Sequence, residues 1–315
     1  MIAALLLSLC AMAAGVWFWT TYSMYGVNVV LRRGGSYWLT MRTDDPRLSP
    51  AMRAALSVAP PKALPGTITW RTLDPGFEAG ELPVLANGHE VDRILLARID
   101  PRRYKFTVRN APAGDKGIDA WEQALPRSVL IVNASYFDLK GMPDTPIVSD
   151  GTPLGPRTYD ARSGAFVART GQAQIVDLTG QTWQQAFRGT TNAVVSYPLL
   201  IGTDGKSHVL SKSRWLANRT FVGQTRDGDI LIGTTRDAFF SLDRLAAFLI
   251  ASPLDLKLAL NLDGGPVACQ SIRLGAYHRK FYAKWEAQVS GNTVKLLASP
   301  WGQWAMPMAL TVERR

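Results

Sequence analysis

The sequence predicts an α+β protein, with a single mixed, mostly antiparallel and sheet-rich domain that follows an N-terminal membrane helix. Three features indicate this fold class: many short alternating apolar segments separated by turn residues, few segments with helical periodicity, and a long uncharged N-terminus. Of the 315 residues, 47% are hydrophobic and 19% are charged, which is typical of a globular protein with a sizeable core. No internal repeat and no low-complexity tract interrupts this pattern.

The N-terminus is the clearest compositional feature. Residues 1–31 carry no charged side chain, and Trp17, Trp19 and Tyr22 suit the interfacial belt of a membrane-spanning helix. A cleaved signal peptide competes, because residues 11–13 form an Ala-x-Ala pattern, although no basic segment precedes it. We predict that residues 1–31 are a transmembrane anchor or an uncleaved signal.

The side of the membrane on which the domain lies is predicted less directly. Arg32 and Arg33 follow the apolar segment, and the positive-inside rule then favours a cytoplasmic domain. Long domains, however, cross membranes largely regardless of such flanking charge. We expect a single-pass protein of the inner membrane with its domain in the periplasm.

Residues 32–65 separate the apolar segment from the domain. This region contains Pro46, Pro50, Pro60, Pro61 and Pro65, which is typical of a linker. We predict a Pro-rich tether over residues 32–65 and a folded domain over residues 66–315.

Turn chemistry places the hairpins of this domain. Residues 92–100 and 102–110 flank Pro101, and residues 164–170 and 173–179 flank Gly171. Residues 219–225 and 229–235 are joined by an Arg-Asp-Gly-Asp turn, the strongest turn signal in the chain. Two helices are expected, one over residues 119–125 and one over residues 242–251 with Ser241 as its N-cap.

The stretch LDLKLALNLDGG, residues 254–265, alternates leucine with other residues and therefore predicts a strand with all five leucines on one side. Asn261 and Asp263 then share the other side, next to Gly264 and Gly265, which permit close backbone approach. This arrangement is typical of an edge that contacts a ligand. A strand followed by a tight turn, with the aspartate bonded to the turn backbone, is an equal alternative.

Two further segments repeat or complement this pattern. The buried strand 129–132 ends at Asn133, which is followed by small residues and by Tyr136; a turn closed by Asn133 is the simpler alternative. Arg219 stands among Thr, Phe and Val at the start of a strand, where a buried guanidinium requires a carboxylate or a ligand anion. A surface arginine is the competing interpretation.

Together the segments NASYFD, NRTFVGQTRDGDILIG and LALNLDGG resemble, in order and spacing, the motifs of the phosphodiester glycosidase family over residues 90–275. The family includes the N-acetylglucosamine-1-phosphodiester alpha-N-acetylglucosaminidases and bacterial members. The chain departs from the family pattern at Ala134, Ser135 and Pro266. The resemblance implies catalytic roles for Asp263, Arg219, Asn133 and Asn261, and substrate contacts for Thr220, Gly264, Gly265 and Tyr136.

The reaction that this resemblance implies is hydrolysis of a sugar-1-phosphodiester on a cell-envelope glycan or phosphoglycoconjugate. Arg219 is expected to grip the phosphate, and Asp263 to act on water or to stabilise the oxocarbenium-like centre. Asn133 and Asn261 are expected to hold sugar hydroxyls. Candidates for a second carboxylate are Asp138 and Asp150, and Trp215 is a candidate for stacking on a sugar.

Other classes of function stay open at this stage. The altered flanks of the motifs favour a catalytically inactive, membrane-anchored module that binds a glycan or a phospholipid. The net charge of +10 favours anionic partners in general, and residues 273–285 interleave basic and aromatic side chains as single-strand nucleic-acid platforms do. Cys269 with His278 is a further candidate nucleophile. The sequence holds no His-x-x-x-His or Cys-x-x-Cys pair, so we predict no metal site, no cofactor is implied, and we expect no nucleic-acid partner.

Overall fold

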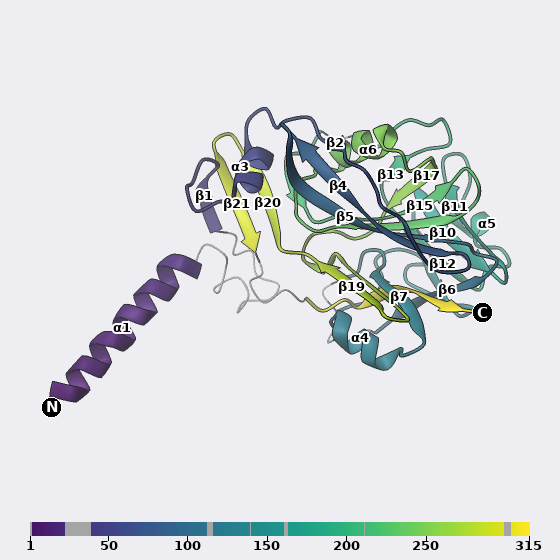
Figure 1. The fold of residues 1–315 in the computed structure, drawn as a ribbon. Helices are drawn as coiled ribbons and strands as arrows, with labels where there is room; N and C mark the ends of the chain where they lie inside the picture. The colour runs from purple at the N-terminus through teal and green to yellow at the C-terminus, as the bar shows by residue number, and fades with distance from the viewer. Residues whose placement is uncertain are drawn as a thin grey trace.

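The computed structural model describes residues 2–22, 39–111, 116–138, 140–160, 163–210, 212–298 and 304–315. Strands in four sheets dominate these residues, and short helices lie around them (Figure 1). All strand pairs between the described residues are antiparallel, such as the long pair of β4 and β5. The prediction of a sheet-rich α+β domain is confirmed.

The largest sheet has eight strands; seven follow the order β13-β17-β15-β16-β5-β4-β2, and β3 pairs with β4. The strands are β2 (Leu64–Pro65), β3 (Arg71–Asp74), β4 (Phe77–Ala86), β5 (His89–Ile99), β13 (Leu199–Ile201), β15 (Thr220–Thr225), β16 (Ile230–Thr235) and β17 (Leu256–Asn261). The β15–β16 pair is the hairpin predicted over residues 219–235. Because β17 pairs with β15, Asn261 and Phe221 are direct neighbours, and two of the predicted site segments lie side by side.

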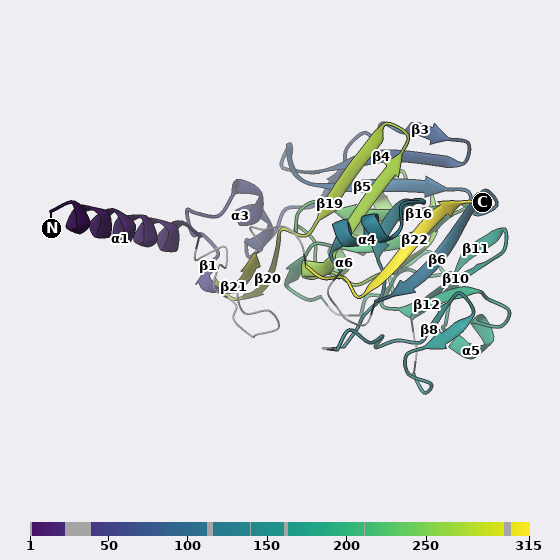
Figure 2. The same cartoon turned by 90° about the horizontal axis from the view of Figure 1, so that it is seen from below.

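The second sheet has the order β19-β18-β7-β22-β6. Its strands are β6 (Tyr104–Asn110), β7 (Ser128–Asn133), β18 (Cys269–Leu274), β19 (Tyr277–Tyr282) and β22 (Met308–Arg314). The C-terminal strand β22 runs beside β6 and pairs with both β6 and β7 (Figure 2). The predicted hairpin about Pro101 is wrong, because β5 pairs with β4 and β16 while β6 pairs with β22. The turn at Pro101 instead passes the chain from one sheet to another.

Two smaller sheets complete the domain. One has the order β11-β10-β12-β8-β9, and the other has the order β1-β21-β20-β14. Their strands are β1 (Leu39–Arg42), β8 (Ile147–Ser149), β9 (Thr152–Leu154), β10 (Gly164–Arg169), β11 (Gln172–Asp177), β12 (Asn192–Ser196), β14 (Trp215–Ala217), β20 (Trp285–Ser290) and β21 (Thr293–Ala298). The β10–β11 pair confirms the hairpin predicted about Gly171.

The helices of the domain are short. They are α3 (Pro50–Leu56), α4 (Ile118–Ala124), α5 (Trp183–Ala186), α6 (Leu242–Ala251) and the 3₁₀ turn η2 (Gly265–Val267). Two of them, α4 and α6, match the helices predicted over residues 119–125 and 242–251. Ser241 occupies the N-cap position of α6, but its side chain makes no capping hydrogen bond.

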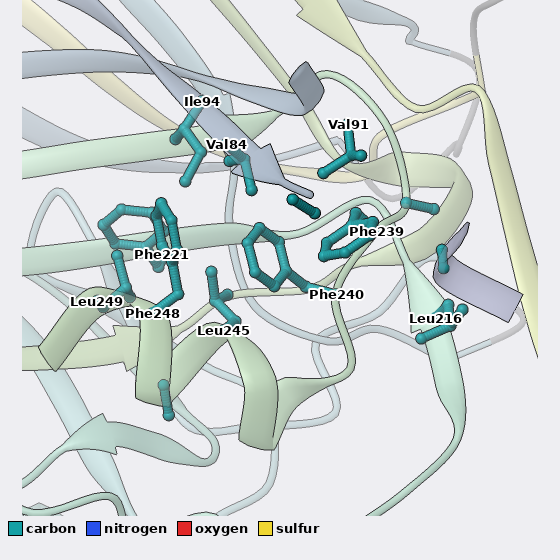
Figure 3. Packing of buried hydrophobic residues seen from close by; sticks show 14 of the residues in the cluster. Val84, Val91, Ile94, Leu216, Phe221, Phe239, Phe240, Leu245, Phe248 and Leu249 are labelled. Carbon is teal, nitrogen blue, oxygen red and sulfur yellow. The ribbon is translucent and has the colours of Figure 1, made fainter. Parts of the chain in front are cut away.

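The helix α6 covers one face of the largest sheet. Leu245, Phe248 and Leu249 lie on one side of the helix, because they are three and four residues apart, and they point toward Ile94 and Phe221 of the sheet (Figure 3). All of these side chains are buried, and each contributes roughly 1.5–3 kcal/mol to stability. The opposite face of the sheet packs against the second sheet, which forms a separate core cluster. The ends of β15 and β17 are therefore held rigidly between two cores.

The N-terminal residues 2–22 form the helix α1 (Ile2–Tyr22). Within the part of the chain that the structure describes, no helix combines the length and the apolarity needed to cross a membrane. The transmembrane anchor predicted over residues 1–31 is therefore not supported, and residues 23–31 lie outside the described residues.

The Pro-rich tether predicted over residues 32–65 is part of the domain wherever the structure describes it. Residues 39–65 contain β1, α3 and β2, and β1 pairs with β21. Leu48, Met52 and Leu56 are buried in the same cluster as α6. The prolines begin and separate these elements instead of preventing them: Pro50 is the first residue of α3, behind the Ser49 cap.

The leucine-rich segment forms a shorter strand than its alternation predicts. β17 begins at Leu256, because Asp255 adopts a positive φ of 50° and the pairing register with β15 shifts between Gln224 and Thr225. Leu254 and Leu256 consequently pack in the α6 cluster, whereas Leu258, Leu260 and Leu262 pack in the core between the sheets. The prediction that all five leucines line one side is wrong for this reason.

Candidate functional site

The backbone that follows β17 presents Asp263 at the junction of the two large sheets. The Asp263 amide donates a hydrogen bond to the Ala134 carbonyl over 2.9 Å, and the Gly264 amide donates to Asp263 Oδ1 over 2.8 Å. Asp263 is partly exposed, so its carboxyl group is accessible from outside. Burial raises the pKa of Asp263 to about 8, and the negative charges of Glu286 and Asp144 add to this effect. The Gly264 amide and Arg219 oppose the rise but do not cancel it.

The two glycines after Asp263 are needed for steric reasons. Gly265 adopts a positive φ of 65°, and a Cβ atom at this position would lie 2.5 Å from Glu286 Oε2. A Cβ atom at Gly264 would lie 3.0 Å from the Asn218 carbonyl oxygen. The Gly265 amide donates to that same carbonyl over 2.9 Å. The glycines thus let the backbone between Asp263 and Glu286 approach the start of β15.

Arg219 lies at that start of β15 and is only 8% exposed. Its Nε donates to the Phe240 carbonyl over 3.2 Å, and its Nη2 donates to the Trp215 carbonyl over 2.8 Å. The third nitrogen, Nη1, lies on the side of Gly264 and makes no hydrogen bond to a described residue. Burial lowers the pKa of Arg219, while Glu286, Tyr136 and Asp263 raise it. Of the guanidinium nitrogens expected to grip a phosphate, only Nη1, on the side of Gly264, has no hydrogen-bond partner among the described residues.

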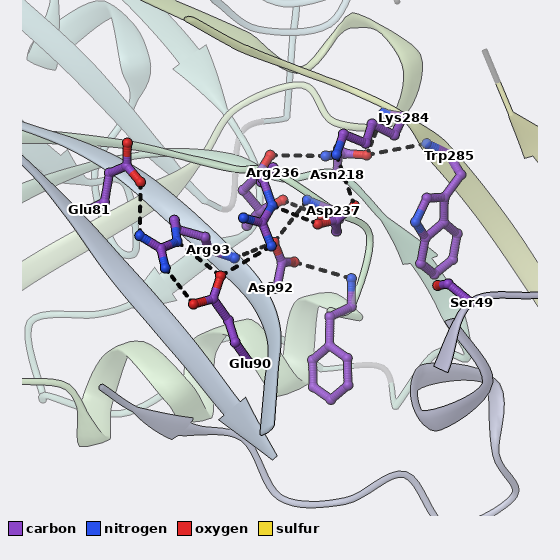
Figure 4. A network of polar contacts seen from close by, with 12 residues as sticks. Ser49, Glu81, Glu90, Asp92, Arg93, Asn218, Arg236, Asp237, Lys284 and Trp285 are labelled. Carbon is purple, nitrogen blue, oxygen red and sulfur yellow. Dashed lines mark hydrogen bonds and ion pairs between the residues drawn. The ribbon is translucent and has the colours of Figure 1, made fainter. Parts of the chain in front are cut away.

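Asn218 fixes Arg219 relative to the strand that carries Glu286. Asn218 Nδ2 donates to the Thr235 carbonyl over 2.9 Å, and Asn218 Oδ1 accepts from the amides of Lys284 and Trp285 over 3.0 and 3.4 Å (Figure 4). One buried amide side chain therefore joins β16, the start of β15 and the start of β20. The sequence motif identified Arg219 but not this neighbour.

The loop after β16 is held by a second buried group. Asp92 accepts hydrogen bonds from the amides of Asp237 and Phe239 over 2.8 and 3.3 Å, as Figure 4 shows. This fixes the segment that ends in the Phe240 carbonyl, the acceptor of Arg219 Nε. Asn218 and Asp92 thus fix the two backbone segments next to the Arg219 guanidinium.

Glu286 of β20 is a site residue that the sequence analysis missed. Its Oε1 accepts a hydrogen bond from Trp215 Nε1, and its Oε2 lies against Gly265. Burial raises the pKa of Glu286, whereas the Trp215 hydrogen bond and the charge of Arg219 lower it. The only signal in the sequence is a glutamate in an alternating strand, which is typical of a solvent-facing residue.

Asn133 and Thr220 support the site from behind. Asn133 is 1% exposed; its Nδ2 donates to the Asp263 carbonyl over 2.7 Å, and its Oδ1 accepts from Thr220 Oγ1 and from the Cys269 amide. Thr220 is fully buried. The structure thus brings Asn133 to Asp263 as expected, but Asn133 bonds the Thr220 hydroxyl and two backbone groups, and Thr220 bonds Asn133, so neither side chain faces a sugar.

Asn261 and Tyr136 meet on the other side of Asp263. Asn261 Nδ2 donates to the Tyr136 hydroxyl over 2.8 Å and to the Tyr197 carbonyl over 3.0 Å, and the Tyr136 hydroxyl donates to that same carbonyl over 2.8 Å. The Tyr136 and Tyr197 rings stack with centroids 4.4 Å apart. Asn261 Oδ1 is buried and has no partner among the described residues. Tyr197, which no motif indicated, therefore belongs to the wall of the site.

Residues 126–274 match the family model described as phosphodiester glycosidase. The resemblance predicted from the sequence is confirmed. Among solved structures, the catalytic domain of zebrafish N-acetylglucosamine-1-phosphodiester alpha-N-acetylglucosaminidase, auto-inhibited by its pro-peptide, is 15% identical and covers 93% of each chain with a TM-score of 0.49. A hypothetical protein from Synechocystis is 14% identical with a TM-score of 0.48, and the match covers 79% of this chain and 64% of that one. No curated protein matches the chain.

The phosphodiester glycosidase match contains Asn133, Arg219 and Asp263, whereas Glu286 lies beyond its end. The two carboxylates proposed from the sequence as partners of Asp263 are placed elsewhere. Asp138 accepts from the amides of Lys140 and Met142 and closes a turn. Asp150 pairs with Arg109 at 2.9 Å and with Lys105 at 3.4 Å.

The other candidates outside the phosphodiester glycosidase motifs do not form a site. Cys269 Sγ is buried against Met306 Sδ, and burial raises the pKa of the Cys269 thiol to about 12. His278 lies against Glu122 instead, so it cannot activate that thiol. In the described part of the chain, no three His, Cys, Asp or Glu side chains gather as metal ligands do.

The basic and aromatic segment 273–285 contains the end of β18, the whole of β19 and the first residue of β20, and β18 and β19 form a hairpin. Its charges have acidic partners: Lys280 pairs with Asp119 and Glu122, and Arg279 pairs with Glu81. These pairs reduce the positive potential that binding of a nucleic-acid backbone requires.

Proposed function

We propose that the domain hydrolyses a glycosyl phosphodiester at the bond between the anomeric carbon and the phosphate oxygen. The observation that carries this proposal is the pair of carboxyl groups, Asp263 and Glu286, on either side of the two glycines and beside the free edge of Arg219. A pair of carboxyl groups, one acting as the acid and the other as the base, is the arrangement used at a glycosidic bond. The family match supports this reaction class.

The protonation states of Asp263 and Glu286 indicate which of them acts as the acid and which as the base. With a pKa of about 8, Asp263 is about 90% protonated at pH 7 and can donate its proton to the departing phosphate oxygen. Burial raises the pKa of Glu286 as well, but the hydrogen bond from Trp215 and the charge of Arg219 oppose this rise and favour the anionic form. Glu286 is therefore the base that removes a proton from the attacking water.

Asp263 and Glu286 supply both proton transfers that the hydrolysis requires. The water oxygen forms a bond to the anomeric carbon, and the bond from that carbon to the phosphate oxygen breaks with its electron pair on the oxygen. Asp263 protonates this oxygen, and Glu286 takes the proton of the water. The products are a free sugar and a phosphomonoester, and the negative charge that develops on the phosphate faces Arg219 Nη1.

Replacing Arg219 with lysine is expected to lower kcat/KM about 100-fold, mainly through KM. One ammonium group cannot bond the Phe240 and Trp215 carbonyls and also reach the phosphate. Steady-state kinetics measure the effect, with Arg226→Lys as the matched control, because Arg226 lies at the surface and pairs with Asp255. Unchanged kinetics of Arg219→Lys would remove Arg219 from the phosphate site.

The experiment that tests the proposal uses the full-length protein and a panel of sugar-1-phosphate methyl esters with glucose, galactose, mannose and N-acetylglucosamine. Release of free sugar from at least one member is expected. Tight binding of a member with no release of sugar would instead support the inactive glycan-binding module that Ala134, Ser135 and Pro266 suggest.

We also infer that the domain acts outside the cytoplasm, in the periplasm of a bacterium. The uncharged run of residues 1–31 supports this inference. Fusion of alkaline phosphatase or of a fluorescent protein after Arg315 tests it. Active phosphatase is expected; fluorescence with inactive phosphatase would place the domain inside the cell.

A further inference from the structure

The strand order of the largest sheet places two walls of the candidate site on opposite sides of Asp263. The strand β17, which Asp263 follows, pairs with β15 on one side and with β13 on the other. Arg219 directly precedes β15, and Tyr197 stands two residues before β13. A substrate whose phosphate lies at Arg219 and whose glycosidic bond lies at Asp263 therefore extends its sugar toward Tyr197.

Tyr197 presents an aromatic surface on that side. Its ring stacks on Tyr136 with an angle of 24° between the ring planes, and the residue is still 44% exposed. Together with Tyr159 it lines a cavity of about 530 Å³, which is large enough for one small organic ligand. The stacking on Tyr136 thus leaves part of the Tyr197 ring open to a ligand.

The main chain of Tyr197 is fixed to the strand that leads to Asp263. The Tyr197 carbonyl accepts hydrogen bonds from Asn261 Nδ2 over 3.0 Å and from the Tyr136 hydroxyl over 2.8 Å. Because these bonds use the carbonyl group, they do not depend on the Tyr197 side chain. The position of the ring relative to Asp263 is therefore set before a ligand arrives.

Asp144 adds a carboxylate next to this ring. Its amide donates to the Tyr136 carbonyl over 3.0 Å, and its side chain is exposed and makes no hydrogen bond or ion pair with a described residue. Burial raises the pKa of the Tyr197 phenol, and the charges of Asp144 and Asp263 raise it further. Burial, Tyr197 and Asp144 likewise raise the pKa of the Tyr159 phenol. The charge of Asp144 thus acts on both phenols that line the cavity.

An open aromatic ring beside a free carboxylate fits the two kinds of surface that a pyranose offers. The C–H groups on one face of a pyranose are apolar and can cover an aromatic ring, whereas the hydroxyl groups at its rim donate to carboxylate oxygens, which only accept. The same carboxylate repels a second negative charge. This combination selects a sugar that carries no acidic group.

We propose that Tyr197 and Asp144 form the sugar subsite: the sugar lies with its C–H face on the Tyr197 ring, and Asp144 accepts from its hydroxyl groups and selects a neutral hexose over a uronic acid. The proposal rests on the proposed function, because it takes Arg219 as the phosphate site and Asp263 as the group at the glycosidic bond.

Methyl glycosides test the subsite alone, because they lack the phosphate and methanol is a poor leaving group. NMR titration of the full-length protein compares the methyl glycosides of glucose, galactose, mannose and N-acetylglucosamine with those of the corresponding uronic acids. At least one neutral glycoside is expected to bind, about fivefold more tightly than its uronic acid, since two unit charges about 4 Å apart in water repel by this factor. Binding of none of the neutral glycosides, or equal Kd values within every pair, would overturn the proposal.

Variants of Tyr197 test the stacking. Tyr197→Ala is expected to weaken binding of the neutral glycoside about fivefold, the factor for roughly 40 Å² of apolar surface that is no longer covered. Tyr197→Trp keeps an aromatic ring and should bind at least as tightly as the wild type. The matched control is Tyr277→Ala, since Tyr277 is also partly exposed but belongs to β19. A loss with Tyr197→Trp or with Tyr277→Ala as large as that with Tyr197→Ala would overturn the stacking.

Asp144→Asn tests the charge at an exposed position on which no described side-chain contact depends. It is expected to remove most of the preference for the neutral glycoside over its uronic acid, whereas Asp255→Asn, the control at another exposed aspartate, should keep it. An unchanged preference in Asp144→Asn would overturn the selection by Asp144.

The outcomes separate this proposal from the proposed function. Hydrolysis of sugar-1-phosphate methyl esters by a protein whose glycoside binding is unaffected by Tyr197→Ala and Asp144→Asn would overturn the subsite alone. The expected binding pattern in a protein that hydrolyses no glycosyl phosphodiester would overturn the proposed function and leave a sugar-binding site at Tyr197.

Discussion

Replacing Asp263 with asparagine is expected to reduce kcat/KM for a glycosyl phosphodiester about 10²- to 10⁴-fold at pH 7. The loss has this size because proton donation by a positioned carboxyl group contributes about that factor. In the wild-type protein, activity should fall as the pH rises through about 8, because Asp263 then loses the proton it must donate. The measurement is steady-state kinetics from pH 5 to about pH 9.5.

The same substitution should change stability in a pH-dependent way. The pKa of Asp263 is about 8 in the folded state, against an ordinary value of 3.8. Between about pH 4 and about pH 8, Asp263 is therefore protonated in the folded state and ionised in the unfolded state. The stability of the wild type therefore falls as the pH rises from about 4 to about 8. Asparagine cannot ionise, so the variant should match the wild type at about pH 4 and exceed it at pH 9, by a few kcal/mol.

Thermal unfolding at the two pH values checks this, with Asp255→Asn as control, because Asp255 is exposed and outside the site. Near-normal activity of Asp263→Asn at pH 7 would exclude Asp263 as the acid. A variant less stable than the wild type at pH 9 would contradict the buried neutral state of this carboxyl group.

Replacing Glu286 with glutamine is expected to reduce kcat about 10³-fold with little change in KM. Glutamine keeps the shape that fits against Gly265 and can still accept the Trp215 hydrogen bond, but it cannot take a proton from water. Because only the chemical step is affected, the variant should still bind the phosphodiester substrate.

Kinetics and calorimetry on Glu286→Gln separate these two effects. Glu78→Gln serves as the matched control, because Glu78 pairs with Arg98 away from the site. A rise in KM without loss of kcat would make Glu286 a binding residue and leave the reaction without its base.

The parts of the fold that depend on local turn chemistry could be predicted. The β15–β16 hairpin follows from its Asp-Gly turn, and the β10–β11 hairpin from Gly171. The hairpin about Pro101 was wrong because two adjacent strands with a turn between them can still enter different sheets. The pairing of β22 with β6 and β7 joins residues about 175 to 210 positions apart, and no local signal encodes it.

The tether was misjudged because proline content was weighed above spacing. Leu48, Met52, Ala55 and Leu56 are four, three and one residues apart, the spacing of a buried helical face. All four are buried. Helical periodicity within a proline-rich segment was the signal that could have found α3.

The site could be located from its motifs but not completed from them. Asp263, Arg219 and Asn133 meet at strand ends, as the order of the motifs implied, and Asn133 bonds the Asp263 carbonyl directly. The sequence does not show which way a side chain points, so Asn133 was expected to face a sugar, although it bonds the Asp263 carbonyl, the Cys269 amide and the Thr220 hydroxyl. Glu286 reaches the site through a sheet pairing with β14, and nothing near it in the sequence marks it.

The central claim is that the bond to the anomeric carbon breaks, and isotope transfer from water tests it most directly. The full-length protein hydrolyses a sugar-1-phosphate ester in ¹⁸O-labelled water, and mass spectrometry follows the label in both products. Attack at the anomeric carbon predicts ¹⁸O in the sugar and none in the phosphomonoester. Label in the phosphate would show attack at phosphorus and would contradict the roles assigned to Asp263 and Glu286.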